Sequence, residues 1–193
     1  FHLPNGHITP ALIAGNVVIF KPSEHTPLVS ELMVKLWVEA GIPNGVITLL
    51  HGSKDEVRRL AKHPKTNGLL FTGGHVAGMS LSKLMAGYPH KILALELGGN
   101  NPLVVWNTRK LKKASNLIFE SAFISSGQRC TCARRLVLQN SKSSRKIIEL
   151  IKNKSKSLSY RESSKEYFYG PLISKAAVKN FIDFQDLLIK AGG

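Results

Sequence analysis

Short apolar segments alternate with helical segments along the first half of this chain, and this alternation restricts its fold more than any other feature. The apolar segments expected as strands are residues 16–20, 45–50, 68–72 and 92–96, and the helical patterns between them are residues 28–40, 55–62 and 76–85. Consecutive parallel strands need a crossover between them, and a helix usually supplies it. The pattern therefore predicts an α/β fold built from right-handed βαβ units.

The pattern changes near Gly98 and Gly99. The elements expected beyond it are a strand at 102–106, a long helix at 111–125, a strand at 135–138, a basic helix beginning at 142, a polar loop at 158–169 and a helix at 174–191. We therefore expect two parts, residues 1–98 and residues 99–193, which meet at a change of role rather than at a flexible linker.

Composition limits the classes of protein to which this chain can belong. Its 193 residues are 43% hydrophobic, which is enough for one domain or for parts of two. No apolar run approaches the roughly 20 residues that span a bilayer. The two cysteines, Cys130 and Cys132, lack the spacing of a disulfide framework or of a metal site. We expect a reduced, cytoplasmic protein without a bound metal.

The formal net charge is +15, and the basic residues are dense between positions 109 and 165. Such a charge raises the alternative of a nucleic-acid-binding module. In the basic stretch 142–165, the apolar residues expected to share one side of a helix are Ile147, Ile148, Leu150 and Ile151. We expect the charged side to be solvated, because neither a pattern of interleaved aromatic residues nor a recognised nucleic-acid-binding motif supports the alternative. A steep salt dependence of binding would mark the alternative.

Two short motifs carry candidate catalytic groups. Glu96 stands before Leu97, Gly98 and Gly99, where a carboxylate can serve as a general base beside closely approaching backbone. The second motif is Gly127-Gln128-Arg129-Cys130, which places a nucleophilic thiol beside a guanidinium that favours the thiolate. Cys132 is the rival thiol. Asn100 and Asn101 extend the Gly-Gly turn, and we expect them to satisfy backbone groups there.

Candidate cofactor-binding groups follow two of the expected strands, since ligands bind at the carboxyl ends of parallel strands. Lys21 and Glu24 come after the first strand and can hydrogen-bond to ribose or phosphate groups. Gly73 and Gly78 stand at the start of the helix after the third strand, where glycines let backbone N–H groups approach a pyrophosphate. Their G-x-x-x-x-G spacing differs from the common dinucleotide fingerprint. A tight strand-to-helix turn is the alternative explanation.

Taken in order along the chain, these motifs resemble the aldehyde dehydrogenase superfamily. That family carries Glu-Leu-Gly-Gly and Gly-Gln-x-Cys at about this spacing, and also the Lys-Pro-Ser-Glu found at residues 21–24. The resemblance implies part of a Rossmann-like NAD-binding domain followed by the first part of an α/β catalytic domain. It implies NAD contacts at Lys21, Glu24, Gly73, Gly78 and Leu97. Gly74 departs from the family pattern, because a serine usually stands there.

The resemblance also implies a chemistry and a role for each motif. The thiolate of Cys130 would attack an aldehyde to give a thiohemiacetal, and Glu96 would activate the water that hydrolyses the later thioester. The backbone N–H of Cys130 would donate to the developing oxyanion. Glu24 favours NAD over NADP, because a carboxylate repels a 2′-phosphate.

Within the family, residues 2–8, 91–102 and 127–135 are similar to the subgroup that oxidises N-succinylglutamate 5-semialdehyde in arginine catabolism. Arg129 is the first candidate for contact with this anionic substrate, whereas Arg134 and Arg135 are expected to be structural ion-pair partners. The similarity covers only the middle of the family's length, and full-length members are expected to form homo-oligomers. A truncated, inactive remnant is therefore a further alternative.

Overall fold

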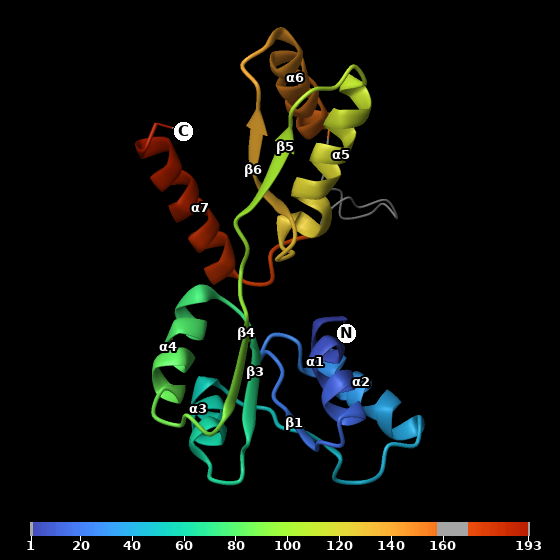
Figure 1. Cartoon of the computed structure of the whole chain (residues 1–193), viewed down its shortest axis with the longest axis vertical. Coiled ribbons are helices and arrows are strands. Elements are labelled where there is room, and N and C mark those ends of the chain that lie inside the picture. The colour runs from blue at the N-terminus through green and yellow to red at the C-terminus, as the bar shows by residue number, and fades with distance from the viewer. Residues whose placement is uncertain (1, 158–169, 193) are drawn as a thin grey trace. The chain divides into compact units, whose positions relative to one another are not determined.

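The structure is a computed structural model that describes residues 2–157 and 170–192. It divides into two compact units, Phe1–Leu97 and Gly98–Gly193, which are described separately (Figure 1). The segment expected as a polar loop, residues 158–169, lies outside the described residues. The end of the basic stretch, residues 158–165, lies outside them too.

The first unit follows the alternation of strands and helices expected from the sequence. Its elements are α1 (His2–Ile13), β1 (Val18–Phe20), α2 (Pro27–Glu39), β2 (Ile47–Leu49), α3 (Lys54–Lys62), β3 (Gly68–Thr72), α4 (His75–Met85) and β4 (Ile92–Glu96). The third and fourth strands begin and end where the apolar runs predicted. Buried side chains from four helices form its core, namely Ile8, Met33, Ala61, Leu81 and Met85.

The strands of this unit form two separate parallel pairs. β1 pairs with β2, and β3 pairs with β4, each as a two-stranded sheet. The N–H of Val18 donates to Val46 and the C=O of Phe20 accepts from Leu50, so both residues face β2. In a strand the N–H and C=O of one residue point to the same edge, and those of the next residue point to the opposite edge. Ile19 therefore directs its backbone N–H and C=O to the edge of β1 that no described strand covers.

The free edge of β3 has the same character. Backbone hydrogen bonds at Asn67 and Gly73 are made to β4, so Leu70 in the register between them presents its N–H and C=O to the other edge. The side chains of Ile19 and Leu70 are 51% and 45% exposed, which is high for apolar residues of parallel strands. The single sheet suggested by the alternation is thus divided into two pairs among the described residues.

A buried lysine fastens β4 to the end of α3. The ammonium of Lys91, a residue only 8% exposed, donates to the carbonyl oxygens of Ala61 at 2.9 Å and His63 at 2.7 Å. It also lies 4.8 Å from the centre of the Tyr88 ring. The last carbonyls of a helix lack partners within the helix, and a cation there also interacts favourably with the helix dipole.

Replacing Lys91 by methionine is expected to lower the free energy of unfolding by about 2–3 kcal/mol, because one buried and one partly buried carbonyl lose a charged donor. Urea unfolding followed by circular dichroism measures this change. Lys35→Met is the matched control, since Lys35 is exposed and its ammonium lies 3.7 Å from the carboxylate of Glu39, which is also exposed. Equal stability of the two variants would contradict this role of Lys91.

The second unit contains one parallel pair of strands and three α-helices in the described residues. Its elements are β5 (Asn101–Val105), α5 (Leu111–Phe123), a 3-10 turn (Ile124–Gly127), β6 (Ala133–Leu138), α6 (Lys142–Ser157) and α7 (Lys175–Lys190). β5 pairs with β6, and α5 packs on both α6 and β6. Phe119, Cys132 and Ile147 are its most deeply buried large side chains.

The buried side of α6 differs from the expected one at Ile148. Ile147 is 1% exposed, whereas Ile148 is 40% exposed. One residue turns an α-helix by about 100°, so Ile148 leaves the stripe that Ser144 and Ile147 begin. The sequence placed both isoleucines on one side of the helix; Ile147 is buried there, whereas Ile148 is exposed.

The last helix, α7, packs few of its side chains. None of its residues is buried, and its exposed apolar side chains include Val178, Phe181, Phe184 and Leu188. Across residues 2–157 and 170–192, no helix combines the length and the apolar character needed to cross a membrane.

Candidate functional site

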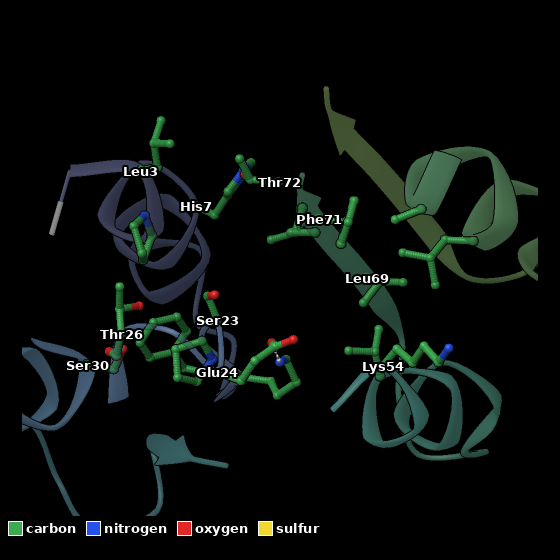
Figure 2. A pocket seen from close by; sticks show the side chains of 18 of the residues that line it. Leu3, His7, Ser23, Glu24, Thr26, Ser30, Lys54, Leu69, Phe71 and Thr72 are labelled. Carbon is green, nitrogen blue, oxygen red and sulfur yellow. Dashed lines mark hydrogen bonds and ion pairs between the residues drawn. The ribbon is translucent and has the colours of Figure 1, made fainter. Parts of the chain in front are cut away.

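A cavity of about 1110 Å³ opens in the first unit, beside β1 and β3 (Figure 2). Residues of both strands line it, and so do the loops that follow them. Lys21 and Glu24 after β1 and Gly74 after β3 are among the lining residues. The cavity thus lies where polar groups follow parallel strands, which is a common position for ligand sites in α/β folds.

Lys21 and Glu24 form a linked pair beside this cavity. The Lys21 ammonium donates to the carbonyl of Gly52 at 2.9 Å and lies 3.8 Å from a Glu24 carboxylate oxygen. The Lys21 side chain is 14% exposed and that of Glu24 is 65% exposed. A hydrogen bond from its own backbone amide lowers the pKa of Glu24, and the charge of Lys21 adds to this effect. Glu24 therefore presents an ionised, accessible carboxylate.

The turn from β3 into α4 depends on its glycines. A Cβ on Gly73 would lie 2.5 Å from the tip of the Phe71 ring, so the turn tolerates no side chain there without a shift of that ring. Gly73 donates its N–H to the carbonyl of Glu96 at 3.0 Å. Gly74 is the N-cap of α4 and provides no side-chain capping bond. The first turn of α4 therefore offers backbone N–H groups to an anion.

The other two residues expected at the cofactor contact each other. A Cβ on Gly78 would lie 2.5 Å from a methyl carbon of Leu97. Gly78 is buried in the first turn of α4, and it lets Leu97 pack directly on the helix backbone. Neither residue lines the cavity. The structure thus gives Gly78 a packing role, which is separate from any contact with a cofactor.

The candidate base, Glu96, is the last residue of β4 and has an exposed side chain. It pairs in register with Thr72 at the end of β3. The hydroxyl of Thr72 in turn lies 3.1 Å from Nε2 of His7 on α1, as Figure 2 shows. Three elements of the first unit therefore meet where its strands end.

The candidate nucleophile follows an unusual turn in the second unit. Ser125, Ser126 and Gly127 have φ angles of 54°, 57° and 65°. Left-handed geometry is uncommon for residues other than glycine, and consecutive examples mark a strained segment that its surroundings hold. Because of this turn, α5 ended two residues earlier than the helical pattern predicted.

The two thiols lie in different environments. Cys130 is exposed, whereas Cys132 is 2% exposed and its sulfur lies 3.7 Å from the carbonyl of Ile124. A nucleophile must reach its substrate, so exposure favours Cys130 over Cys132. Cys132 instead belongs to the core of the second unit.

Gly99, the last residue of the first candidate motif, lies against the backbone of Cys130. A Cβ on Gly99 would overlap the carbonyl oxygen of Cys130, so only glycine fits at this close approach. The side-chain amide of Asn101 donates to the carbonyl of Cys130 at 2.6 Å and to that of Cys132 at 3.1 Å. The sequence predicted that Asn101 would satisfy backbone groups, but it gave no sign that these groups flank the nucleophile.

The arginines around Cys130 make hydrogen bonds to neighbouring polar groups. Arg129 Nε donates to the hydroxyl of Ser125 at 3.0 Å. Arg134 donates to the carbonyl of Arg129 at 3.2 Å, and Arg135 donates to that of Asn100 at 3.0 Å. Among the residues that the structure describes, Arg134 and Arg135 thus make hydrogen bonds to carbonyl oxygens in place of the expected ion pairs.

In the part of the chain that the structure describes, no group of three or more His, Cys, Asp or Glu side chains could hold a metal ion.

A family model for the aldehyde dehydrogenase family matches residues 1–193. The chain belongs to the aldehyde dehydrogenase family. Its fold is the aldehyde dehydrogenase fold, with short parallel strands and helices, as expected from the motifs.

Solved structures of this family resemble the chain closely. One, described as a methylmalonate-semialdehyde dehydrogenase from Sinorhizobium meliloti 1021 in complex with NAD, has 25% identity and a TM-score of 0.91, and the match covers 98% of this chain and 39% of that one. An NAD-dependent aldehyde dehydrogenase from Sinorhizobium meliloti has 28% identity and a TM-score of 0.89, covering 96% and 37%. A variant of proline utilization A from Bradyrhizobium japonicum has 32% identity and a TM-score of 0.87, covering 96% and 19%.

This aldehyde dehydrogenase chain therefore spans less than two fifths of the length of these relatives.

Proposed function

We propose that this chain provides the cofactor-binding and nucleophilic elements of an enzyme that oxidises an aldehyde to a carboxylic acid with NAD. The observation that carries the proposal is the contact between the two motifs, in which Gly99 and Asn101 lie against the backbone of an exposed Cys130. Family membership supports the same chemistry.

The residues beside the cavity of the first unit fit a dinucleotide. The Glu24 carboxylate can accept hydrogen bonds from the two hydroxyls of a ribose, and the Lys21 ammonium beside it can donate. The uncapped first turn of α4 supplies N–H groups and a positive dipole end for a pyrophosphate. Bound NAD supplies the acceptor for the hydride that leaves the substrate carbon.

The chain's own groups account for the remaining steps. The Cys130 sulfur forms a bond to the aldehyde carbon, and the carbonyl oxygen takes up the negative charge. Loss of hydride from that carbon leaves a thioester on Cys130. Glu96 then takes a proton from water, the hydroxide adds to the thioester carbon, and the C–S bond breaks. The products are a carboxylate and the free thiol, so the aldehyde is oxidised by two electrons.

For the substrate we propose an aldehyde that carries carboxylates, and specifically N-succinylglutamate 5-semialdehyde. The local sequence 127–135 supports this substrate, and Arg129, Arg134 and Arg135 give the Cys130 loop a positive charge. Arg129 Nε is engaged by Ser125, while the two terminal nitrogens of its guanidinium can face a carboxylate. A semialdehyde of a dicarboxylic acid suits this electrostatic environment better than a neutral aldehyde.

The proposal is tested by mixing the purified chain with NAD and N-succinylglutamate 5-semialdehyde and following NADH absorbance. NADH formation supports an active dehydrogenase. A folded chain that binds NAD, as measured by calorimetry, but forms no NADH with this aldehyde or with propanal would instead support the inactive remnant.

Arg129→Gln is expected to raise KM for the carboxylated aldehyde about 10–100-fold, because a charge-assisted hydrogen bond is lost. The kcat/KM for propanal should change much less, since propanal carries no carboxylate. Steady-state kinetics with both substrates measure the difference. Arg145→Gln is the control, because Arg145 lies on α6 and donates to Asn140 at 3.3 Å. Equal losses with both aldehydes would contradict the assignment.

A further inference from the structure

We infer that Asn101 is the residue that positions Cys130, by holding both ends of the segment that carries the two cysteines. This inference rests on the proposed function, in which Cys130 is the nucleophile. Asn101 itself touches backbone atoms and not the reacting sulfur, so it acts through the orientation of the loop.

The geometry of the two hydrogen bonds carries the inference. A carboxamide has two N–H donors, and those of Asn101 reach the carbonyls of Cys130 and Cys132 on either side of Thr131. Each carbonyl belongs to a rigid planar peptide group. Holding the Cys130 carbonyl fixes the rotation that follows its Cα, and so fixes the direction of its side chain relative to β5.

The backbone around Asn101 is built for this contact. Asn101 pairs with Ala133, but the next residue, Pro102, pairs with Arg135, so Arg134 is an extra residue in β6. Such bulges redirect side chains next to functional sites. The absence of a Cβ at Gly99 leaves room both for the Cys130 carbonyl and for the Asn101 amide. A further backbone hydrogen bond closes the turn that contains Cys130, because the N–H of Cys132 donates to the carbonyl of Arg129 at 3.1 Å.

The test replaces Asn101 by leucine, which has a similar shape and no donor, and by serine, which keeps one donor. Asn100→Leu is the matched control, because Asn100 is the exposed neighbour whose carbonyl, rather than its side chain, accepts from Arg135. The whole 193-residue chain of each variant is treated with iodoacetamide under native conditions. Mass spectrometry of the peptides then gives separate labelling rates for Cys130 and Cys132. Steady-state kinetics give kcat and the KM for NAD.

Wild type and Asn100→Leu should label at Cys130 and protect Cys132, which is buried. Asn101→Leu should raise the ratio of Cys132 to Cys130 labelling at least about tenfold, because two hydrogen bonds that close the segment are lost. Its kcat should fall about 10–100-fold, the effect of a small misplacement of a reacting group. The KM for NAD should stay unchanged, because no cofactor contact is altered. Asn101→Ser should lie between wild type and Asn101→Leu.

Labelling and kinetics of Asn101→Leu equal to those of Asn100→Leu would overturn the inference. A fall in kcat accompanied by an equal rise in the KM for NAD would also overturn it, because it would indicate general disruption. If no chain forms NADH, the proposed function fails, and the labelling ratio alone decides the role of Asn101. If circular dichroism shows that Asn101→Leu is unfolded, the comparison of Asn101→Ser with Asn100→Leu decides it.

Discussion

A serine in place of Cys130 is expected to lower NADH formation by at least about 10³-fold while the unfolding midpoint stays unchanged. A hydroxyl at this position is a far weaker nucleophile than a thiolate. Because Cys130 is exposed, the substitution removes little packing. Absorbance of NADH and thermal unfolding by circular dichroism measure the two effects.

Cys132→Ser distinguishes the roles of the two thiols, since Cys132 is buried and its thiol donates a hydrogen bond to the carbonyl of Ile124. We expect Cys132→Ser to lower the unfolding midpoint while NADH formation by the folded fraction is kept, because the substitution places a hydroxyl in the core. Full activity of Cys130→Ser together with an inactive but folded Cys132→Ser would show that Cys132 is the nucleophile.

Gly99→Ala is expected to reduce turnover at least about 10²-fold and to destabilise the second unit by about 1–3 kcal/mol. An added methyl group overlaps the carbonyl of Cys130 and lies 2.6 Å from the amide nitrogen of Asn101. Both are held groups rather than free side-chain ends, so relief requires the nucleophile loop to move. Turnover and urea unfolding, measured on the same preparation, report the two losses.

Gly98→Ala provides the matched comparison one residue earlier. A Cβ on Gly98 meets nothing within 4 Å, so near wild-type behaviour is expected for this variant. If both alanine variants lose activity equally, the Gly-Gly pair acts through its flexibility, and the close approach at Gly99 is unimportant.

The sequence predicted secondary structure well because local signals agreed. β3 and β4 were predicted residue by residue, since glycine or polar residues bound each apolar run. It failed where tertiary contacts decide the outcome. Ile148 is apolar and next to buried Ile147, yet its angular position on α6 turns it to the surface. The end of α5 was misplaced because no local rule predicts left-handed geometry at Ser125 and Ser126.

The candidate site was predictable in its residues and not in its geometry. Motif order alone selected Cys130 and Glu96, and their catalytic roles stay predictions, as do the cofactor contacts, a cytoplasmic location and homo-oligomeric assembly. The sequence predicted that Asn101 extends the Gly-Gly turn and satisfies backbone groups; it is instead the first residue of β5, and the groups it satisfies are the carbonyls of Cys130 and Cys132. The carbonyls that Asn101 binds could not be predicted, because they lie in the segment before β6, where the strand register shifts beside Asn101.

The open edges at Ile19 and Leu70 have a practical consequence for any measurement of assembly. Rows of N–H and C=O groups on uncovered strands are templates for other extended chains, and the apolar side chains of α7 add to this tendency. Oligomers that form as the purified chain is concentrated are therefore expected to arise from pairing of uncovered strands between copies. Their size is a poor guide to the quaternary structure of the longer dehydrogenases in this family.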